Sequence, residues 1–276
     1  MTDAGGAIGV FDSGVGGLTV LRALRSVLPQ ERFVYLGDTA RLPYGTKSAA
    51  SVVRYSLQCA DALVGRGIRY LVVACNTASA SALDALRLRY PNIPVIGVIE
   101  PGAAAAVSAS RTRHIAVIGT EGTIGGGAYQ AAIQRLDAHV RVTARACSLF
   151  VAAAEEGWVE GPIVEAIARR YLEPIFSGGQ SRGAAAAVPD TLVLGCTHFP
   201  VLAATLRAVL PEHVTLVDSA ATVAAAVARE LPAAANPPGR GSVTWLATDG
   251  AARFARVSGV FLGEALRPED VEVIDL

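Results

Sequence analysis

The chain has 276 residues, of which 52% are hydrophobic and 17% charged, with 24 acidic and 24 basic side chains. This length accommodates two α/β domains of ordinary size, and the balanced charge gives no electrostatic reason to expect nucleic acid or a membrane as a partner. The first residues carry no basic charge, and no window is apolar for long enough to span a membrane. We therefore expect a cytoplasmic protein.

Strand-like and helix-like patterns alternate in the first part of the chain. Short apolar runs that fit buried parallel strands occur at residues 8–11, 33–36, 70–74 and 94–98. Stretches with helical spacing or high alanine content follow them at 18–28, 48–65, 78–89 and after residue 102. This order of elements predicts βαβ units.

The same alternation resumes further along. Apolar runs predict strands at 115–118, 140–145, 191–194, 215–217, 243–247 and 271–274. Helices are expected up to about residue 136, over 160–176 and up to residue 210. The small-residue stretches 177–188 and 232–241 are predicted loops. The predicted fold class is α/β, with doubly wound parallel sheets.

Two pairs of segments resemble one another across the chain. Residues 8–14 resemble 115–121, where a strand opens a glycine-rich loop, and 72–77 resemble 193–198, where a strand ends in cysteine. Any two βαβ units contain a strand that opens a loop. The resemblance of residues 8–14 to 115–121 therefore fits an internal repeat and a coincidence about equally well. The matched cysteines favour two copies of one α/β plan.

The four cysteines are Cys59, Cys75, Cys147 and Cys196, and none forms a C-x-x-C pair. Their wide spacing argues against a zinc knuckle or a disulfide framework. Cys75 and Cys196 each follow a predicted strand, at the edge where open α/β sheets bind ligands. A buried structural thiol is the ordinary alternative for a free cysteine, and we prefer it for Cys59 and Cys147.

Two thiols on opposite sides of a small molecule suit racemisation. That reaction removes a proton from one face of a carbon and returns one to the other. A cysteine thiol has an ordinary pKa of about 8.5, which a helix start can lower. The sequence therefore predicts Cys75 and Cys196 as paired acid/base groups in a cleft between the two repeats.

Polar residues near the same strand ends are candidates for substrate binding. His198 could adjust the pKa of Cys196 or relay protons to it. The ordinary alternative is that His198 caps a helix. Asp12 ends a predicted strand beside Ser13 in a glycine-rich loop, which favours a role in the site over the ordinary alternative of a helix N-cap. Glu155 and Glu156 precede a glycine and would ordinarily face solvent. Hydrogen-bonding groups for a carboxylate are offered by Asp12, Ser13, Asn76, Thr77, Thr120 and Thr197.

No cofactor or metal is expected. Residues 12–17 do not match G-x-G-x-x-G, and residues 45–48 lack the Gly-Lys pair of a P-loop. Pyridoxal phosphate needs a Schiff-base lysine, and the only lysine is Lys47. His198 is the only soft ligand near Cys75 or Cys196 in the sequence, so a metal site is not predicted.

Four separated segments resemble signature segments of the glutamate racemases, within the aspartate/glutamate racemase superfamily. They are Phe11-Asp12-Ser13-Gly14-Val15-Gly16-Gly17-Leu18, Pro43-Tyr44-Gly45, Ala74-Cys75-Asn76-Thr77-Ala78 and Gly195-Cys196-Thr197-His198-Phe199-Pro200. The resemblance extends from residue 8 to about residue 219. One departure is the segment 150–155, which reads Phe-Val-Ala-Ala-Ala-Glu where the family often has Phe-Val-Pro-Leu-Val-Glu.

The resemblance implies cofactor-independent interconversion of L- and D-glutamate, which supplies D-glutamate for peptidoglycan. Cys75 would exchange the proton of the D-enantiomer and Cys196 that of the L-enantiomer. The thiols would be assisted by Asp12, Glu155 and His198. Substrate would be held by Asp12, Ser13, Tyr44, Gly45, Asn76, Thr77, Thr197 and His198.

The resemblance also implies an architecture. Two α/β domains related by pseudo-twofold symmetry would enclose the active site, and homodimers are usual in the family. Residues 1–98 with 207–276 would form the first, discontinuous domain, and residues 99–206 the second. Competing interpretations are an aspartate or hydantoin racemase and a non-catalytic protein that binds a small dicarboxylate.

Overall fold

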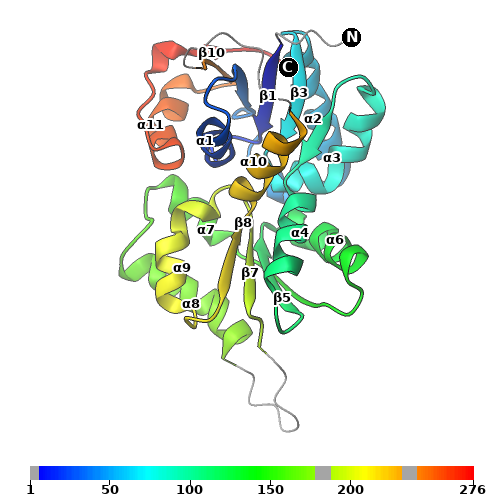
Figure 1. The fold of residues 1–276 in the computed structure, drawn as a ribbon. Helices are drawn as coiled ribbons and strands as arrows, with labels where there is room; N and C mark the ends of the chain where they lie inside the picture. Colours follow the sequence, from blue (N-terminus) through cyan, green and yellow to red (C-terminus); the bar gives the residue numbers. More distant parts are fainter. Residues whose placement is uncertain (1–5, 178–187, 232–240) are drawn as a thin grey trace.

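The computed structural model describes residues 6–177, 188–231 and 241–276. The predicted loops at 177–188 and 232–241 fall outside the described residues except at their ends. Within these ranges the chain forms two sheets, one above the other in Figure 1, each accompanied by helices. All strand pairings are parallel, which confirms the predicted α/β class.

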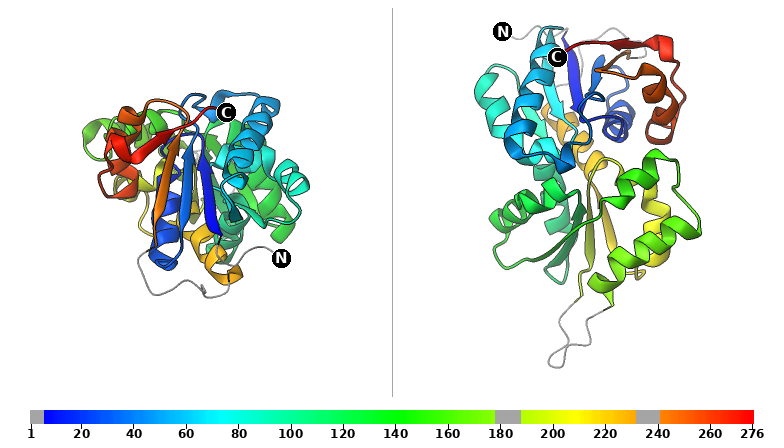
Figure 2. Two further views of the ribbon diagram at one scale, coloured as in Figure 1. Left: turned by 90° about the horizontal axis from the view of Figure 1, so that it is seen from above. Right: turned by 180° about the vertical axis from the view of Figure 1, so that it is seen from behind.

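The six-stranded sheet has the order β10-β9-β2-β1-β3-β4. Its strands are β1 (Ala7–Asp12), β2 (Phe33–Gly37), β3 (Ile68–Val73), β4 (Val95–Gly97), β9 (Val243–Ala247) and β10 (Val271–Val273). The intervening helices are α1 (Leu18–Val27), η1 (Tyr44–Thr46), α2 (Ala49–Val64), α3 (Asn76–Arg89), α11 (Ala251–Leu262) and η3 (Pro268–Asp270). We call this assembly the six-stranded half; seen from above, helices lie on both sides of its strands (Figure 2).

The four-stranded sheet has the order β6-β5-β7-β8. Its strands are β5 (His114–Gly119), β6 (Arg141–Ala146), β7 (Thr191–Gly195) and β8 (Thr215–Asp218). The helices between them are α5 (Glu121–Gly125), α6 (Ala128–Leu136), α7 (Leu149–Glu155), α8 (Pro162–Phe176), η2 (Phe199–Leu202) and α9 (Ala203–Val209). This is the four-stranded half.

Two helices carry the chain between the halves. Helix α4 (Ile99–Ala109) leads into the four-stranded half and α10 (Ser219–Glu230) leads out of it, and the two pack on each other. Helix α10 also packs along α1. One continuous apolar core runs through the contact, with Val10 and Leu21 from one half and Val117 and Val193 from the other.

The structure corrects the predicted boundary at residue 207. That boundary places β8 with the six-stranded half, but β8 pairs with β7 from Thr191↔Thr215 to Leu194↔Asp218. The edge of β7 presents backbone N–H and C=O groups that need partners, and β8, which follows after η2 and α9, supplies them. The chain therefore returns to the six-stranded half through α10.

Two predicted helices also differ in detail. The helix expected to run up to residue 136 is split into α5 and α6, because Gly127 adopts a left-handed conformation with φ 67°. The helix expected after Cys196 begins instead with the 3-10 turn η2, which contains Pro200 in its first turn. Both differences arise from the backbone conformations of glycine and proline, which cannot be predicted from the spacing of apolar residues.

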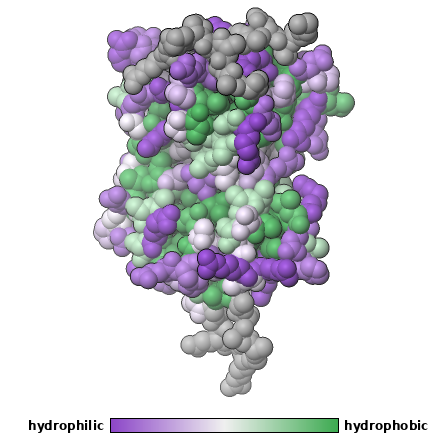
Figure 3. All heavy atoms as spheres, viewed as in Figure 1, coloured by the Kyte–Doolittle hydropathy of each residue, from purple (hydrophilic) through white to green (hydrophobic). Residues whose placement is uncertain are grey.

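The surface is mixed in character. On the face shown in Figure 3, apolar residues lie mainly over the middle of the molecule, and polar residues gather toward its edges. No helix among the described residues has both the length and the apolar character needed to cross a membrane.

Candidate active site

Cys75 and Cys196 lie at the carboxyl ends of β3 and β7, one in each half. Both side chains are buried, each with 5% exposure. Cys75 is the N-cap of α3, and its sulfur accepts a hydrogen bond from the Ala78 N–H at 3.5 Å. Cys196 is followed by the short turn η2 rather than by a long helix, so the predicted helix start is present behind one thiol only.

Both thiols line one small cavity between the halves, with a volume of about 40 Å³. It is lined by Ser13, Pro43, Tyr44, Gly45, Cys75, Asn76, Thr77, Thr120, Val151, Cys196, Thr197 and His198. The structure thus brings together every predicted site residue except Asp12 and Glu155, which lie directly behind the lining. Pro43 and Val151 also line the cavity and were not predicted, although Pro43-Tyr44-Gly45 and the segment 150–155 both stand out in the sequence.

The surroundings of Cys75 favour its thiol form. Burial, reinforced by the negative charge of Asp12, raises the pKa of Cys75 to about 12. Its sulfur donates to the Ser13 hydroxyl at 3.7 Å. The favourable helix start is therefore outweighed by burial, and this thiol carries its proton at neutral pH.

Asp12 is fully buried at the end of β1. Its Oδ2 accepts a hydrogen bond from the Gly14 N–H at 3.0 Å, and its Oδ1 accepts one from Thr197 Oγ1 at 3.5 Å. Burial raises the pKa of Asp12, and the positive charge of His198 partly opposes that rise. Asp12 therefore links the loop after β1 to the loop that carries Cys196.

Cys196 belongs to a chain of polar contacts with His198 and Glu155. His198 Nδ1 lies 3.8 Å from the Cys196 sulfur, and His198 Nε2 lies 3.1 Å from Glu155 Oε1. Burial opposes a charged imidazole, but the hydrogen bonds to Cys196 and Glu155 outweigh it and raise the pKa of His198 to about 10. His198 is therefore a cation at neutral pH, placed to stabilise negative charge on the neighbouring sulfur.

Glu155 is not the solvent-facing residue that the sequence alone suggested. Its side chain is only 15% exposed. Burial would raise its pKa, but hydrogen bonds from His198 and Arg253 prevail and lower it to about 2. Nothing in the spacing of the sequence pointed to Arg253, which lies about a hundred residues further along.

Polar side chains from both halves meet on the other wall of the cavity. Thr77 Oγ1 of α3 lies 3.0 Å from Thr120 Oγ1 and 3.2 Å from Thr123 Oγ1. Asn76 Oδ1 accepts a hydrogen bond from the Tyr129 hydroxyl of α6 at 2.8 Å. The amide nitrogen Nδ2 of Asn76 is buried and has no protein partner, which leaves a donor available on the cavity wall.

Tyr44 and Gly45 reach the cavity from the loop after β2. The Tyr44 hydroxyl donates to the buried carboxylate of Asp38, which also accepts from Thr248 Oγ1 at 2.9 Å. A Cβ atom on Gly45 would lie 2.6 Å from Thr120 Cβ. The loop therefore needs glycine here, because it packs directly against the four-stranded half.

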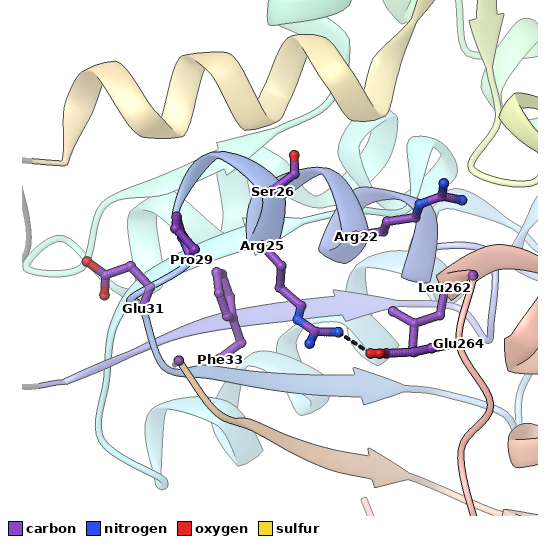
Figure 4. Close-up of a pocket in the computed structure, with 10 residues that line it drawn as sticks. Arg22, Arg25, Ser26, Pro29, Glu31, Phe33, Leu262 and Glu264 are labelled. Carbon is purple, nitrogen blue, oxygen red and sulfur yellow. Dashed lines mark hydrogen bonds and ion pairs between the residues drawn. The ribbon is translucent and has the colours of Figure 1, made fainter. Parts of the chain in front are cut away.

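A larger cavity of about 340 Å³ lies elsewhere, between α1, the start of β2 and the end of α11 (Figure 4). Arg25 forms an ion pair with Glu264 across it, while Arg22 lies beside it on the same helix. This cavity contains no thiol and no histidine. It therefore lacks the paired acid/base groups of the cavity between the halves.

Neither a lysine nor a metal-binding cluster is found at the cavity between the halves. Its lining does not include Lys47. In the described parts of the chain, no group of three or more His, Cys, Asp or Glu side chains is arranged to hold a metal ion.

Comparison with known proteins assigns the family. The sequence model of the family described as Asp/Glu/Hydantoin racemase matches residues 18–227. The glutamate racemase of Geobacter metallireducens is 50% identical over 263 residues, covering 94% of each chain, and that of Aquifex aeolicus is 45% identical, covering 95% of this chain and 96% of its own.

Solved structures agree. Glutamate racemase RacE1 from Bacillus anthracis has a TM-score of 0.88 at 34% identity, covering 99% of each chain. Glutamate racemase from Thermus thermophilus, in complex with beta-chloro-D-alanine, has a TM-score of 0.85 at 42% identity, covering 99% of this chain and 98% of its own. These findings confirm the resemblance seen in the four sequence segments. The chain therefore belongs to the Asp/Glu/Hydantoin racemase family, and within it to the glutamate racemases.

Proposed function

We propose that this protein interconverts L- and D-glutamate with Cys75 and Cys196 as its two acid/base groups. The observation that carries the proposal is that one thiol from each half lines the same cavity. A carbon held between them has an acid/base group on each face. No cofactor is required, because the two thiols can supply and accept the proton.

The proton transfers balance as follows. In one direction, the Cys196 thiolate takes the α-proton of L-glutamate, and the electron pair of the broken C–H bond stays on the substrate. The Cys75 thiol then donates its proton to the opposite face, which forms D-glutamate and leaves Cys75 as the thiolate. The reverse direction begins from that state. The raised pKa of Cys75 and the cationic His198 suit the starting arrangement for the L-enantiomer.

The developing negative charge falls partly on the substrate carboxylate. Asn76 Nδ2, a buried donor without a protein partner, is placed to bind that group. The hydroxyls of Ser13, Thr77, Thr120 and Thr197 add further donors around the cavity. Because its volume is only about 40 Å³, we infer that the cavity widens when an amino acid binds.

The choice of glutamate rests on the sequences of the relatives. We further propose that the product D-glutamate serves peptidoglycan synthesis and that the enzyme acts in the cytoplasm as a homodimer, as the family resemblance implies. An aspartate or hydantoin racemase would share the two thiols but would act on a different carbon acid.

The test is incubation of the purified protein with L-glutamate in deuterated buffer without added cofactor. We expect optical rotation to decay to zero while deuterium enters the α-carbon. Parallel incubations with L-aspartate and a hydantoin should show much slower exchange. A protein that binds glutamate but incorporates no deuterium would instead be the non-catalytic binding protein.

A separate prediction concerns the orientation of the Asn76 amide. Replacing Tyr129 by phenylalanine keeps the ring but removes the hydrogen bond to Asn76 Oδ1. The amide can then turn its oxygen toward the substrate carboxylate, so we expect KM to rise by about tenfold, the effect of one hydrogen bond to a charged group, and kcat to fall as well, because negative charge develops on that carboxylate. Steady-state kinetics measure both constants.

The matched control for this variant is Tyr70→Phe. Tyr70 also donates its hydroxyl to a side chain, Glu230, but neither residue lines the cavity. Its KM should match that of the wild type. An unchanged KM in the Tyr129→Phe variant would show that this hydrogen bond does not orient the amide for substrate.

A further inference from the structure

Glu155 is held from both sides by cations that come from different halves. Its Oε1 contacts His198 Nε2 at 3.1 Å, within the four-stranded half. Its Oε2 accepts a hydrogen bond from Arg253 Nη2 at 2.7 Å, and Arg253 belongs to α11 of the six-stranded half. The chain of contacts that begins at the Cys196 sulfur therefore ends on the opposite half.

Helix α11 makes a second contact with the same chain. The ring of Phe261 meets the His198 ring edge to face, with centroids 5.0 Å apart and an interplanar angle of 75°. Phe261 is fully buried. One helix thus contacts both the imidazole and its carboxylate partner, so its position determines where the imidazole lies relative to Cys196.

Cys75 has no comparable connection among the residues that the structure describes. Its sulfur forms hydrogen bonds with Ser13 Oγ and the Ala78 N–H, both within the six-stranded half. The support provided by α11 is therefore unequal between the two thiols, although the reaction treats the two faces of the substrate alike.

We propose that Arg253 is a positioning residue that acts, through Glu155 and His198, on the proton transfers at Cys196 and not on those at Cys75. This inference rests on the proposed two-thiol reaction. Arg253 is not among the residues that line the cavity, so we assign it no contact with substrate. Its guanidinium holds Glu155 Oε2, which keeps Oε1 directed at His198 and the other ring nitrogen directed at the sulfur.

The exposure of the Arg253 side chain limits how much its contact with Glu155 can contribute to the rate. The Arg253 side chain is 47% exposed, so solvent screens its charge, whereas Glu155 is 15% exposed. We expect Arg253→Gln to lower kcat by about three- to tenfold. This loss lies between the effect of losing an exposed ion pair and that of losing a buried hydrogen bond to a charged group. Arg253→Lys keeps the charge but loses the planar fork, and should recover part of the loss.

A rate loss alone does not show which thiol is affected. Since enantiomers are equally stable, kcat/KM must fall equally in the two directions for any variant. The α-deuterium isotope effect on kcat/KM is different, because it reports only the step that removes the labelled proton. α-Deuterated L-glutamate reports removal by Cys196, and α-deuterated D-glutamate reports removal by Cys75.

The experiment compares these isotope effects in the wild type, Arg253→Gln, Arg253→Lys and Arg256→Gln. Slower transfer at Cys196 makes that step more rate-limiting. In Arg253→Gln the isotope effect should therefore rise with L-glutamate and fall with D-glutamate. Arg256, exposed on the same helix, is the control and should leave both values unchanged.

The double variant Arg253→Gln with Glu155→Gln gives an independent check. If Arg253 acts through Glu155, the double variant should be no slower than Glu155→Gln alone. Isotope effects that stay unchanged, or that move in the same direction for both enantiomers, would overturn the assignment of Arg253. A wild-type protein without racemase activity would instead overturn the proposed function itself.

Discussion

Replacing either Cys75 or Cys196 by serine should lower kcat for glutamate racemisation by about 10³-fold, within the range of general acid/base catalysis. Serine is nearly the same size as cysteine, but its hydroxyl does not ionise near neutral pH. Each variant retains one thiol, which can serve one face of the substrate only. Both directions of the reaction should therefore be lost together.

The fold should survive these replacements. Cys75 caps α3 through its sulfur, and serine is a favourable residue at an N-cap. Circular dichroism and thermal unfolding should thus show native-like variants, while polarimetry shows the loss of turnover. The matched control is Cys147→Ser, since Cys147 is buried but lies outside the cavity lining. Near-normal turnover in either Cys75→Ser or Cys196→Ser would refute the two-thiol scheme.

Replacing Gly16 by alanine should lower kcat/KM by about 10²-fold, the expected consequence of displacing catalytic groups by an ångström. A Cβ atom at this position would lie 2.4 Å from both His198 Nδ1 and Thr197 Oγ1. The loop cannot simply retreat, because the Thr19 hydroxyl is shared between the Gly16 and Thr197 carbonyl oxygens, each at 2.9 Å. The added methyl group must displace the loop that carries Cys196.

Steady-state kinetics and thermal unfolding separate this local effect from a loss of stability. Gly125→Ala is the control, because a Cβ atom on Gly125 would have no neighbour within 4 Å. That variant should retain full activity. If Gly16→Ala were as active as the control, the loop after β1 would not be holding His198 and Thr197 in the positions that the proposed reaction needs.

The sequence by itself determined most of the strands and helices, their order and the two cysteines that line one cavity. Buried parallel strands are continuous apolar runs. Such runs can be recognised in the sequence, and residues 191–194 are one example. Cys75 and Cys196 could be placed at strand ends for the same reason, and the repeated strand-Cys pattern implied that they face each other. Local patterns are sufficient for these features, because they depend on neighbours along the chain.

Only the tertiary structure decided how the site is tuned. The protonated state of Cys75 depends on burial and on Asp12, which lies on a different strand. Glu155 is largely buried and contacts both His198 and Arg253, and Arg253 belongs to the other half of the molecule. The sheet to which β8 belongs was likewise set by pairing with β7. Desolvation and charge coupling act through space, so residues distant in sequence set them and no local pattern reports them.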